Sequence, residues 1–483
     1  MAVSHRQRFL NDFPKSLLND SGAVFVGAGV SMAAGYPSWM QLLKEIGEEL
    51  GVSSSDVHDL AALAQWSIQS SGGRSKIRKV IRDSIKPDRD VPDSVGTIAR
   101  LPLRHIWTTN YDRLIERAFE AISRPLDTIS AAADLSVPGR PGAVRLYKMH
   151  GSIDRLDDLV ISTDDYELYR SKRAAFLPLL QSHLISMSVL FVGLSLTDPN
   201  IRHVLSLIRE SFADGPPEHF AIVRPPQRGD FKSLGQYRAK LAQHELWAKD
   251  LERYGLLAVE VGKYSDVPKL LRLVEQRVAR GRVWVSGSWP SDTSDTAAAK
   301  VYEVSELVGK LVGTLGLSLV SGAGVVVGSA SISGFLSSLR LGGGWDLERR
   351  LLARPFPQPF VGHTPDEKGW QALRVELARI GGIAIFVGGA KITDGSVRAA
   401  EGVMEEAKLA EAAGAFLIPI GATGGAAHRL AKKLVGSKLP CEGPLAVRPT
   451  DAELLNLCDA SSTPQELVSR VEGILRRVMK PVS

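Results

Sequence analysis

The sequence has few cysteines and no long hydrophobic run. Only Cys441 and Cys458 occur among its 483 residues, which excludes a four-cysteine zinc site and indicates no disulfide framework. No window reaches the roughly 18 consecutive apolar residues of a membrane-spanning helix, and the first residues lack the apolar core of a signal peptide. We therefore expect a cytoplasmic protein with no membrane segment and no bound metal.

A block of basic residues is also missing. The net charge of +6 is spread along the chain, and the densest basic cluster, at residues 74–82, is typical of a solvated helix face. Proteins that bind nucleic acid concentrate such charge on one face, so we expect no nucleic-acid partner. A mild positive charge does suit an anionic small molecule as a ligand.

Short apolar segments alternate with amphipathic helical patterns through the first half of the chain. The predicted strands cover residues 23–26, 105–109, 145–149, 189–192, 219–223 and 256–261. Continuous apolar strands separated by helices are typical of a mostly parallel sheet with both faces covered. Residues 53–86 show helical patterns and no strand, which predicts a helical insertion between the first two strands.

A second α/β segment begins at Arg282. Its predicted strands cover residues 283–286, 317–321, 383–387 and 416–420, and each is followed by small residues. Residues 342–362 are rich in glycine and proline, which predicts a loop over the pocket at these strand ends. A helix predicted over 268–280 ends at Gly281. We therefore expect an α/β fold with two domains, residues 1–281 and 282–483.

Small and polar residues follow three strands of the first half, where open α/β sheets place ligand contacts. They are Gly27, Ala28, Gly29 and Ser31 after the first strand, Thr109, Asn110 and Asp112 after the second, and His150 after the third. Glycine lets a backbone approach a phosphate, an amide binds ribose hydroxyls in either polarity, and an imidazole accepts a proton near neutral pH. The pattern predicts a dinucleotide held beside Asn110 and His150.

Each of these residues also has an interpretation that involves no ligand. A tight turn from strand to helix needs small residues in any case, and Asn110 is a favoured N-cap for the next helix. His150 by itself is equally typical of a buried histidine, and Asp112 of a carboxylate in the first turn of a helix. Their arrangement along one sheet favours the ligand-binding interpretation.

Over residues 15–280 this pattern resembles the sirtuin superfamily. The matching segments are Gly27-Ala28-Gly29-Val30-Ser31, Thr108-Thr109-Asn110-Tyr111-Asp112, His150-Gly151-Ser152 and residues 192–198, which include Gly193 and Ser195. The resemblance implies that the Gly-Ala-Gly turn binds NAD phosphates, that Asn110 contacts the nicotinamide ribose, and that His150 is the general base. It also implies that Gly193 and Ser195 lie by the adenosine ribose.

The sequence departs from the protein deacylases of that superfamily. Those enzymes carry a structural zinc module with four cysteines, which two cysteines cannot supply. The Thr-Thr-Asn-Tyr-Asp form is more similar to the bacterial defence branch, in which NAD is hydrolysed. The missing zinc module argues against binding of a peptide substrate but does not change the expectation that the chain binds NAD.

Residues 282–440 resemble the SLOG superfamily, which binds nucleotide-derived signals. The matching segments are Val285-Ser286-Gly287-Ser288, Val320-Ser321-Gly322-Ala323-Gly324, Phe386-Val387-Gly388-Gly389 and Gly402-Val403-Met404-Glu405-Glu406. The enzymes related to this superfamily carry a Pro-Gly-Gly-x-Gly-Thr stretch that is incomplete in this sequence, which favours binding over catalysis. The expected signal-binding residues are Gly287, Ser288, Gly322, Arg374, Lys391 and Glu406.

Two of these assignments leave alternatives open. Glu405 and Glu406 are neighbours and point about 100° apart on a helix, so only one of them faces a pocket. Arg374 is expected to contact phosphates together with Lys391, but an exposed arginine on an amphipathic helix fits the same pattern. Glu406 is the expected ribose contact.

The order of the two expected domains, both Rossmann-like, is similar to that of the effectors of the Thoeris antiphage family. The similarity implies an NAD+ glycohydrolase that is activated by a cyclic ADP-ribose isomer in the SLOG domain. A TIR-domain protein makes that signal, and the loss of NAD causes abortive infection. The similarity also implies a homotetramer or a higher assembly.

Three other functions remain compatible with the sequence. One is a sirtuin-type deacylase or ADP-ribosyltransferase, whose activity depends on a second substrate. Another is a sensor that binds NAD or a nucleotide without turnover. The third is a nucleotide phosphoribohydrolase that acts through the second half of the chain.

Overall fold

The computed structural model describes residues 4–480 apart from residues 53–58, 87, 197, 213–216, 291–295, 343–345, 358–365, 394–395 and 444–445. The chain divides into two compact units, Met1–Glu275 (unit 1) and Gln276–Val482 (unit 2). The division falls inside helix α14 (Val267–Arg280), which occupies the helix expected over 268–280. Within the described residues, none of the helices combines the length and the apolar character needed to cross a membrane.

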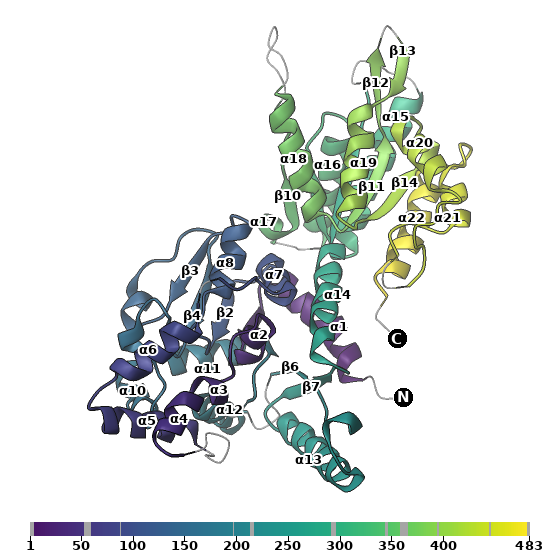
Figure 1. The fold of residues 1–483 in the computed structure, drawn as a ribbon. Coiled ribbons are helices and arrows are strands. Elements are labelled where there is room, and N and C mark those ends of the chain that lie inside the picture. The colour runs from purple at the N-terminus through teal and green to yellow at the C-terminus, as the bar shows by residue number, and fades with distance from the viewer. Residues whose placement is uncertain are drawn as a thin grey trace. The chain divides into compact units, whose positions relative to one another are not determined.

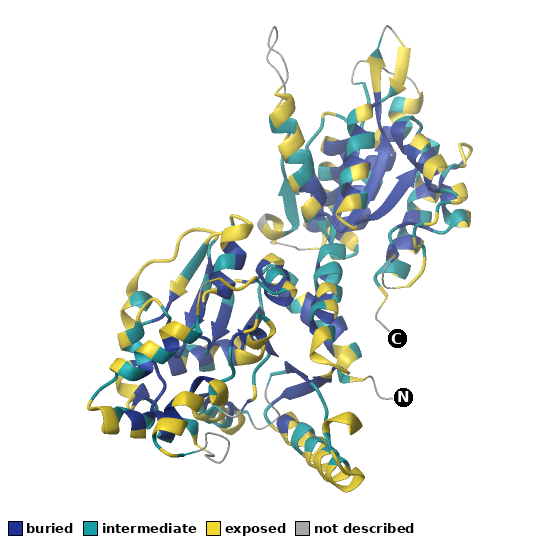
Figure 2. Cartoon of the chain, in the orientation of Figure 1, coloured by how far each residue is buried: buried dark blue, intermediate teal, exposed yellow. Residues whose placement is uncertain are grey.

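Unit 1 is built on a parallel sheet with the strand order β3-β4-β2-β1-β5-β6-β7 in its described residues (Figure 1). The strands are β1 (Gly22–Val26), β2 (His105–Thr108), β3 (Leu126–Ile129), β4 (Val144–Lys148), β5 (Ser188–Val192), β6 (His219–Val223) and β7 (Leu256–Glu260). The central strands are buried, as Figure 2 shows in dark blue, and the Phe25 ring stacks on Phe191 with centroids 5.5 Å apart. The predicted parallel sheet is confirmed.

Helices connect the strands of unit 1. They are α1 (His5–Leu18), α2 (Ala28–Ala33), α3 (Trp39–Leu42), α4 (Lys44–Glu49), α5 (Leu60–Ser71), α6 (Ser75–Ser84), α7 (Asp93–Arg100), α8 (Leu114–Ala121), α9 (Thr163–Glu167), α10 (Tyr169–Lys172), α11 (Phe176–Ser186), α12 (Pro199–Ser211), α13 (Leu234–Glu252) and α14. The described residues between β1 and β2 contain helices and no strand, which confirms the helical insertion. Its apolar side chains form a small core with Leu159 and Ile161.

Two histidines are buried in the core of unit 1, His183 on α11 and His219 at the start of β6. His183 accepts a hydrogen bond at Nδ1 from the Trp107 indole N–H (3.0 Å), and His219 accepts one at Nδ1 from the Val189 backbone N–H (3.2 Å). Burial lowers the pKa of each imidazole to about 4. Both rings are therefore neutral in the folded protein near neutral pH.

We expect unit 1 to lose stability as the pH falls below about 6.5, the ordinary pKa of histidine. The unfolded chain then binds protons that the folded chain excludes, so the free energy of unfolding decreases with falling pH until the folded-state pKa near 4 is reached. At pH 5 each histidine should cost about 2 kcal/mol. Urea unfolding across this pH range measures the effect. A His219→Asn variant with an unchanged pH dependence would contradict it.

Unit 2 is built on a second parallel sheet, with the order β10-β9-β8-β11-β14 in its described residues. Its strands are β8 (Arg282–Ser288), β9 (Ser318–Ser321), β10 (Leu351–Ala353), β11 (Ile383–Gly388) and β14 (Phe416–Ile420), and β12 (Ala390–Thr393) pairs with β13 (Ser396–Ala399) in a separate antiparallel hairpin. Its helices are α15 (Thr296–Thr314), α16 (Val327–Leu341), α17 (Leu347–Arg350), α18 (Glu367–Ile380), α19 (Glu401–Ala412), α20 (Gly425–Leu434), α21 (Asp451–Leu457) and α22 (Pro464–Val478). The expectation of two Rossmann-like sheets is confirmed.

Two edge strands differ from the expectations. β3 was not predicted because only Ile129 of its four residues is buried, so it has no apolar run. The loop expected over 342–362 is wrong in part, since α17 and β10 lie within it; residues 343–345 and 358–362 lie outside the described residues. The three residues of β10 are too few to produce a strand pattern and are only half-buried.

Candidate active site

The carboxyl ends of β1, β2, β4 and β5 meet at one edge of the sheet, because β4, β2, β1 and β5 are consecutive neighbours and run parallel. The register pairs Thr108 of β2 with Lys148 of β4. Asn110 and His150 each lie two residues beyond this pair, so adjacent strands bring them to corresponding positions. Both side chains are nearly buried, with exposed fractions of 9% and 5%.

The Asn110 side chain is held by the turn after β1. Its Nδ2 donates to the Gly27 carbonyl (3.0 Å) and to Ser31 Oγ (2.8 Å), and Ser31 Oγ donates to Asp112 Oδ2 (2.5 Å). Because the Gly27 carbonyl only accepts, the amide nitrogen must face it. Asn110 Oδ1 is buried and has no hydrogen-bond partner among the described residues. A buried polar atom of this kind is a candidate ligand contact.

The alternative roles of Asn110 and Asp112 are partly resolved. Helix α8 begins at Leu114 with Arg113 as its N-cap, so the capping interpretation of Asn110 is wrong. Asp112 does bond the first turn, since its Oδ1 accepts from the Leu114 N–H (3.0 Å), while its other oxygen holds Ser31. Thr109, directly before Asn110 in the chain, is half-buried.

Close backbone contacts join the turn after β1 to the loop after β5. The N–H groups of Gly27 and Gly29 donate to the carbonyls of Val192 and Gly193, both at 2.8 Å. A Cβ at Gly27 would lie 2.5 Å from the Gly193 carbonyl oxygen, and Gly193 itself has a φ of +68°. These glycines are thus required by packing as well as by any ligand. Ala28, Gly29 and Ser195 are exposed at this edge.

His150 faces an acidic side chain. Its Nε2 lies 3.1 Å from Asp198 Oδ2, although the two are not aligned as a hydrogen bond, and the Tyr166 ring packs edge-on at 5.5 Å. Burial alone would raise the pKa of the Asp198 carboxyl. The nearby His150 and the backbone N–H groups of Ile201 and Asn200 outweigh burial and hold that pKa below its usual value. Asp198 is therefore a carboxylate at neutral pH.

Lys148 links the loop after β2, which carries Asn110, to the end of β4, which precedes His150. The Lys148 side chain is 1% exposed, and its ammonium group donates to the carbonyls of Asp112 (2.5 Å) and Tyr111 (3.3 Å) and to Glu116 Oε1 (2.8 Å). Three acceptors satisfy the three donors of the ammonium. Because Lys148 ends β4 and the carbonyls follow β2, this contact fixes the position of Asn110 relative to His150.

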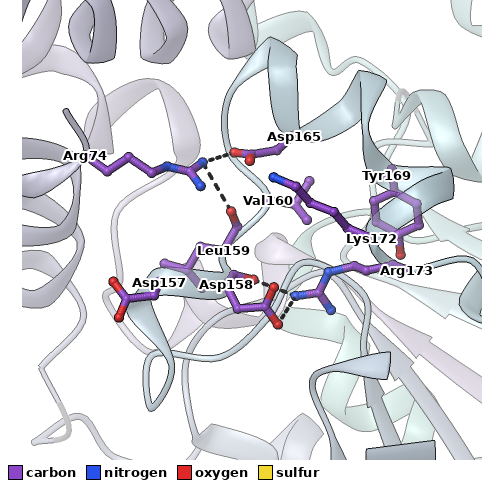
Figure 3. A pocket seen from close by; sticks show the side chains of 9 residues that line it. All are labelled: Arg74, Asp157, Asp158, Leu159, Val160, Asp165, Tyr169, Lys172 and Arg173. Carbon is purple, nitrogen blue, oxygen red and sulfur yellow. Dashed lines mark hydrogen bonds and ion pairs between the residues drawn. The ribbon is translucent and has the colours of Figure 1, made fainter. Parts of the chain in front are cut away.

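A small cavity lies beside this edge, between the helical insertion and the segment that follows His150 (Figure 3). Its volume is about 30 Å³, too little for a dinucleotide, and its charges are mostly paired. Arg74 pairs with Asp165, and Arg173 binds both the carboxylate (2.9 Å) and the carbonyl (2.5 Å) of Asp158. The ion pair between Arg74 and Asp165 therefore connects the helical insertion to the segment after His150. Neither Asn110 nor His150 lines the cavity.

In unit 2 the structure brings Arg374 and Glu406 together. Glu406 is nearly buried; it accepts from the Ser286 hydroxyl (2.6 Å) and from Arg374 Nε (3.4 Å). Burial raises the pKa of Glu406 despite the opposing effects of Ser286 and Arg374. Glu405, in contrast, points to the surface and pairs with Lys408. Glu406 is thus the member of the acidic pair that faces inward.

Of the other expected signal-binding residues, Gly322 is linked to this pair through Phe356. Phe356 lies on Gly322, where a Cβ would come within 2.5 Å of its ring, and the Arg374 guanidinium lies 5.7 Å from the Phe356 centroid and 6.0 Å from that of Trp370. Gly287 and Ser288 end β8, and Ser288 Oγ donates to the Ala390 carbonyl (3.2 Å). Lys391, the next residue, is exposed on the β12–β13 hairpin.

Several residues of both sites were not identified from the sequence. Lys148 and Glu116 form a buried ion pair, and Asp198 contacts His150, but neither role was expected. The signal for Asp198 was its position before Pro199, which marks a helix start. Phe356 and Trp370 were not identified because they lie in or near residues 342–362, whose composition predicted a loop.

Comparisons with known proteins identify both units. Residues 104–249 match the SIR2-like domain family, and residues 266–478 match the Sir2- and TIR-associating SLOG family. The chain is 32% identical over 434 residues to the NAD(+) hydrolase ThsA of Bacillus cereus (strain MSX-D12), covering 88% of this chain and 89% of that protein. It is 31% identical to the NAD(+) hydrolase ThsA of Cytobacillus dafuensis, covering 98% of this chain and 97% of that protein.

A partial relative matches about half of the chain. Defense-associated sirtuin 2 of Bacillus subtilis is 28% identical over 240 residues, which cover 48% of this chain and 23% of that protein. The matches to the two ThsA proteins cover 88% and 98% of this chain and so extend through both units. The chain therefore belongs to the ThsA family of NAD(+) hydrolases.

Proposed function

We propose that this protein hydrolyses NAD+ to nicotinamide and ADP-ribose in its first domain, residues 1–281, as an effector of antiphage defence. The observation that carries the proposal is the pairing of Thr108 with Lys148, which sets Asn110 and His150 at corresponding positions on adjacent strands. The names of the full-length relatives support NAD+ as the substrate. Gly27, Ala28, Gly29, Ser31, Thr109, Asp112, Gly193 and Ser195 are the proposed NAD contacts.

The chemistry requires few catalytic groups. Nicotinamide leaves as a neutral molecule, so the enzyme has to hold the ribose, control the access of water and accept one proton. Asn110 binds the ribose next to nicotinamide. His150 takes a proton from a ribose hydroxyl or from the attacking water. No metal enters this scheme, and its residues need none.

The second domain, residues 282–483, is proposed to sense a cyclic ADP-ribose isomer. Arg374 and Lys391 supply positive charge for the phosphates, and Glu406 supplies an acceptor for a ribose hydroxyl. The proposed signal comes from a TIR-domain protein, which the name of the matching SLOG family supports. The isomer activates by binding the active conformation more tightly than the resting one. The proposed assembly is a homotetramer or larger, and the loss of NAD leads to abortive infection.

The decisive experiment is an NAD+ consumption assay with the purified full chain, with and without cyclic ADP-ribose isomers. Nicotinamide should appear in the presence of one isomer and remain near background without it. Acetylated peptide should have no effect, because the proposed reaction has no second organic substrate. Binding of NAD+ without nicotinamide release under every condition would overturn the proposal.

Arg374→Ala should raise the concentration of isomer needed for half-activation by about 10- to 100-fold, since a charge-assisted contact to phosphate is lost. Titration of the isomer in the NAD+ assay measures this shift. Arg429→Ala is the matched control, because Arg429 is exposed and pairs only with Glu401 among the interactions described for it. Equal thermal unfolding of both variants checks the fold. A normal response of Arg374→Ala would remove Arg374 from the signal site.

A further inference from the structure

Resting on the proposed reaction, we infer that Asp198 is a positioning residue for the general base: its carboxylate orients the His150 imidazole and stabilises the charge that the ring gains. The two side chains come from different loops, 48 positions apart in the sequence, and the structure brings them within 3.1 Å. Asp198 does not need to touch the substrate for this role. It acts through His150.

The carboxylate is held in one place by the start of α12. Asp198 Oδ1 accepts from the backbone N–H groups of Asn200 (2.9 Å) and Ile201 (3.2 Å). The second oxygen, Oδ2, is the one that faces His150, and it also accepts from the Tyr166 hydroxyl (3.4 Å). One oxygen therefore anchors the group while the other remains directed toward the imidazole.

The surroundings make this charge effective. The side chains of His150 and Asp198 are 7% and 11% exposed, so water screens their interaction weakly. Tyr166 faces both groups from α9. Tyr111 and Tyr169 lie close enough to Asp198 to interact with it electrostatically. The more distant charges are those of Asp165, Arg74 and Arg173. Among these groups His150 is the one that gains a positive charge in the proposed reaction.

Proton placement follows from the chemistry of the pair. A carboxylate attracts an N–H and repels a ring lone pair, so the ring form with a proton on Nε2 is favoured where Nε2 lies 3.1 Å from Asp198 Oδ2. Nδ1 then carries the lone pair that receives a proton from a ribose hydroxyl or water. The product of that transfer is an imidazolium ion next to an anion, which lowers the energy of the charged intermediate.

The competing explanation is that Asp198 only caps α12. Asparagine and serine are N-caps as good as aspartate, so Asp198→Asn and Asp198→Ser separate the two roles. We expect both variants to unfold at the wild-type temperature and to keep the KM for NAD+. Their kcat should fall about 10- to 100-fold, because a contact with a charged group has been lost. A capping role alone would leave kcat unchanged in both variants.

A pH profile supplies a readout that a structural role would not move. Removing the negative charge should shift the acidic limb of kcat/KM toward lower pH by about one unit, since a nearby anion favours the protonated ring. Asp157→Asn is the matched control, because Asp157 is 82% exposed and pairs with Arg78 at the surface. It should keep the wild-type profile. An unshifted limb in Asp198→Asn would overturn the inference.

The inference can also fail separately from the proposed reaction. NMR of selectively labelled histidine follows the titration of His150 without turnover, with His150→Gln to identify its signal. Asp198→Asn should move that titration to lower pH even if the assay conditions give no nicotinamide. If the wild type cleaves NAD+ and His150 titrates identically in the wild type and in Asp198→Asn, the role of Asp198 is refuted and the reaction stands. If the titration shifts but NAD+ is not cleaved, the reaction is refuted and the effect of Asp198 on His150 stands.

Discussion

Replacing either Asn110 or His150 with alanine should reduce nicotinamide release from NAD+ by about 100-fold or more, because each change removes a group that acts on the ribose in the transition state. Chromatographic measurement of nicotinamide, with the activating isomer present, provides the test. The loss should appear in kcat. Both residues sit at the same edge of the sheet, two positions beyond a paired residue of β2 or β4.

The double variant Asn110→Ala/His150→Ala gives a sharper form of the same experiment. The effects of substituting residues that act as a unit do not add up, so the double variant should be only slightly less active than the less active of the two single variants. His203→Ala on α12 is a control for histidine removal, since its ring contacts Arg170 at the surface. Full activity in either single variant would reject the proposed active site.

Lys148→Met should destabilise unit 1 by about 3–5 kcal/mol, the usual cost of removing one partner of a buried ion pair. The substitution leaves the Glu116 carboxylate buried without its cation and leaves the carbonyls of Asp112 and Tyr111 without a donor. Methionine is close to lysine in volume, so the effect reports charge and hydrogen bonds more than a cavity. The shift of the unit 1 transition in urea measures the cost.

The variant Lys148→Met/Glu116→Leu separates stability from positioning. Replacing both members of a buried ion pair with apolar side chains is often neutral, so the double variant should regain much of the stability lost by Lys148→Met. Nicotinamide release should stay low, because the backbone that carries Asn110 has lost its contact with β4. If Lys148→Met unfolds at the wild-type urea concentration, the ion pair does not stabilise the unit.

The sequence allowed the central sheets to be predicted, because strands such as β1 and β11 are buried along their whole length and appear as uninterrupted apolar runs. Edge strands escape this signal, as β3 and β10 illustrate. The residues at the strand ends could be placed on one edge because the carboxyl ends of parallel strands meet there. That reasoning brought Asn110 and His150 together.

The partners of those residues could not be predicted in the same way. Asp198 precedes a proline and satisfies the pattern of a helix cap, which it also is, so nothing local distinguishes its second contact. Lys148 ends a strand as an ordinary surface lysine would; its buried charge is paired with Glu116, which lies on α8 and follows a different strand. Such contacts depend on the spatial arrangement of segments that are distant in the chain.

The orientation of the Asn110 amide restricts which analogues of the substrate fit beside it. Both hydrogens of Nδ2 are already committed to Gly27 and Ser31, so the amide offers an incoming sugar only a lone pair. A fluorinated sugar preserves the size of the hydroxyl it replaces but has no hydrogen to donate, and it would set two electron-rich atoms against each other. Substrate analogues would therefore gain from a hydrogen-bond donor beside Asn110 and lose from fluorine there.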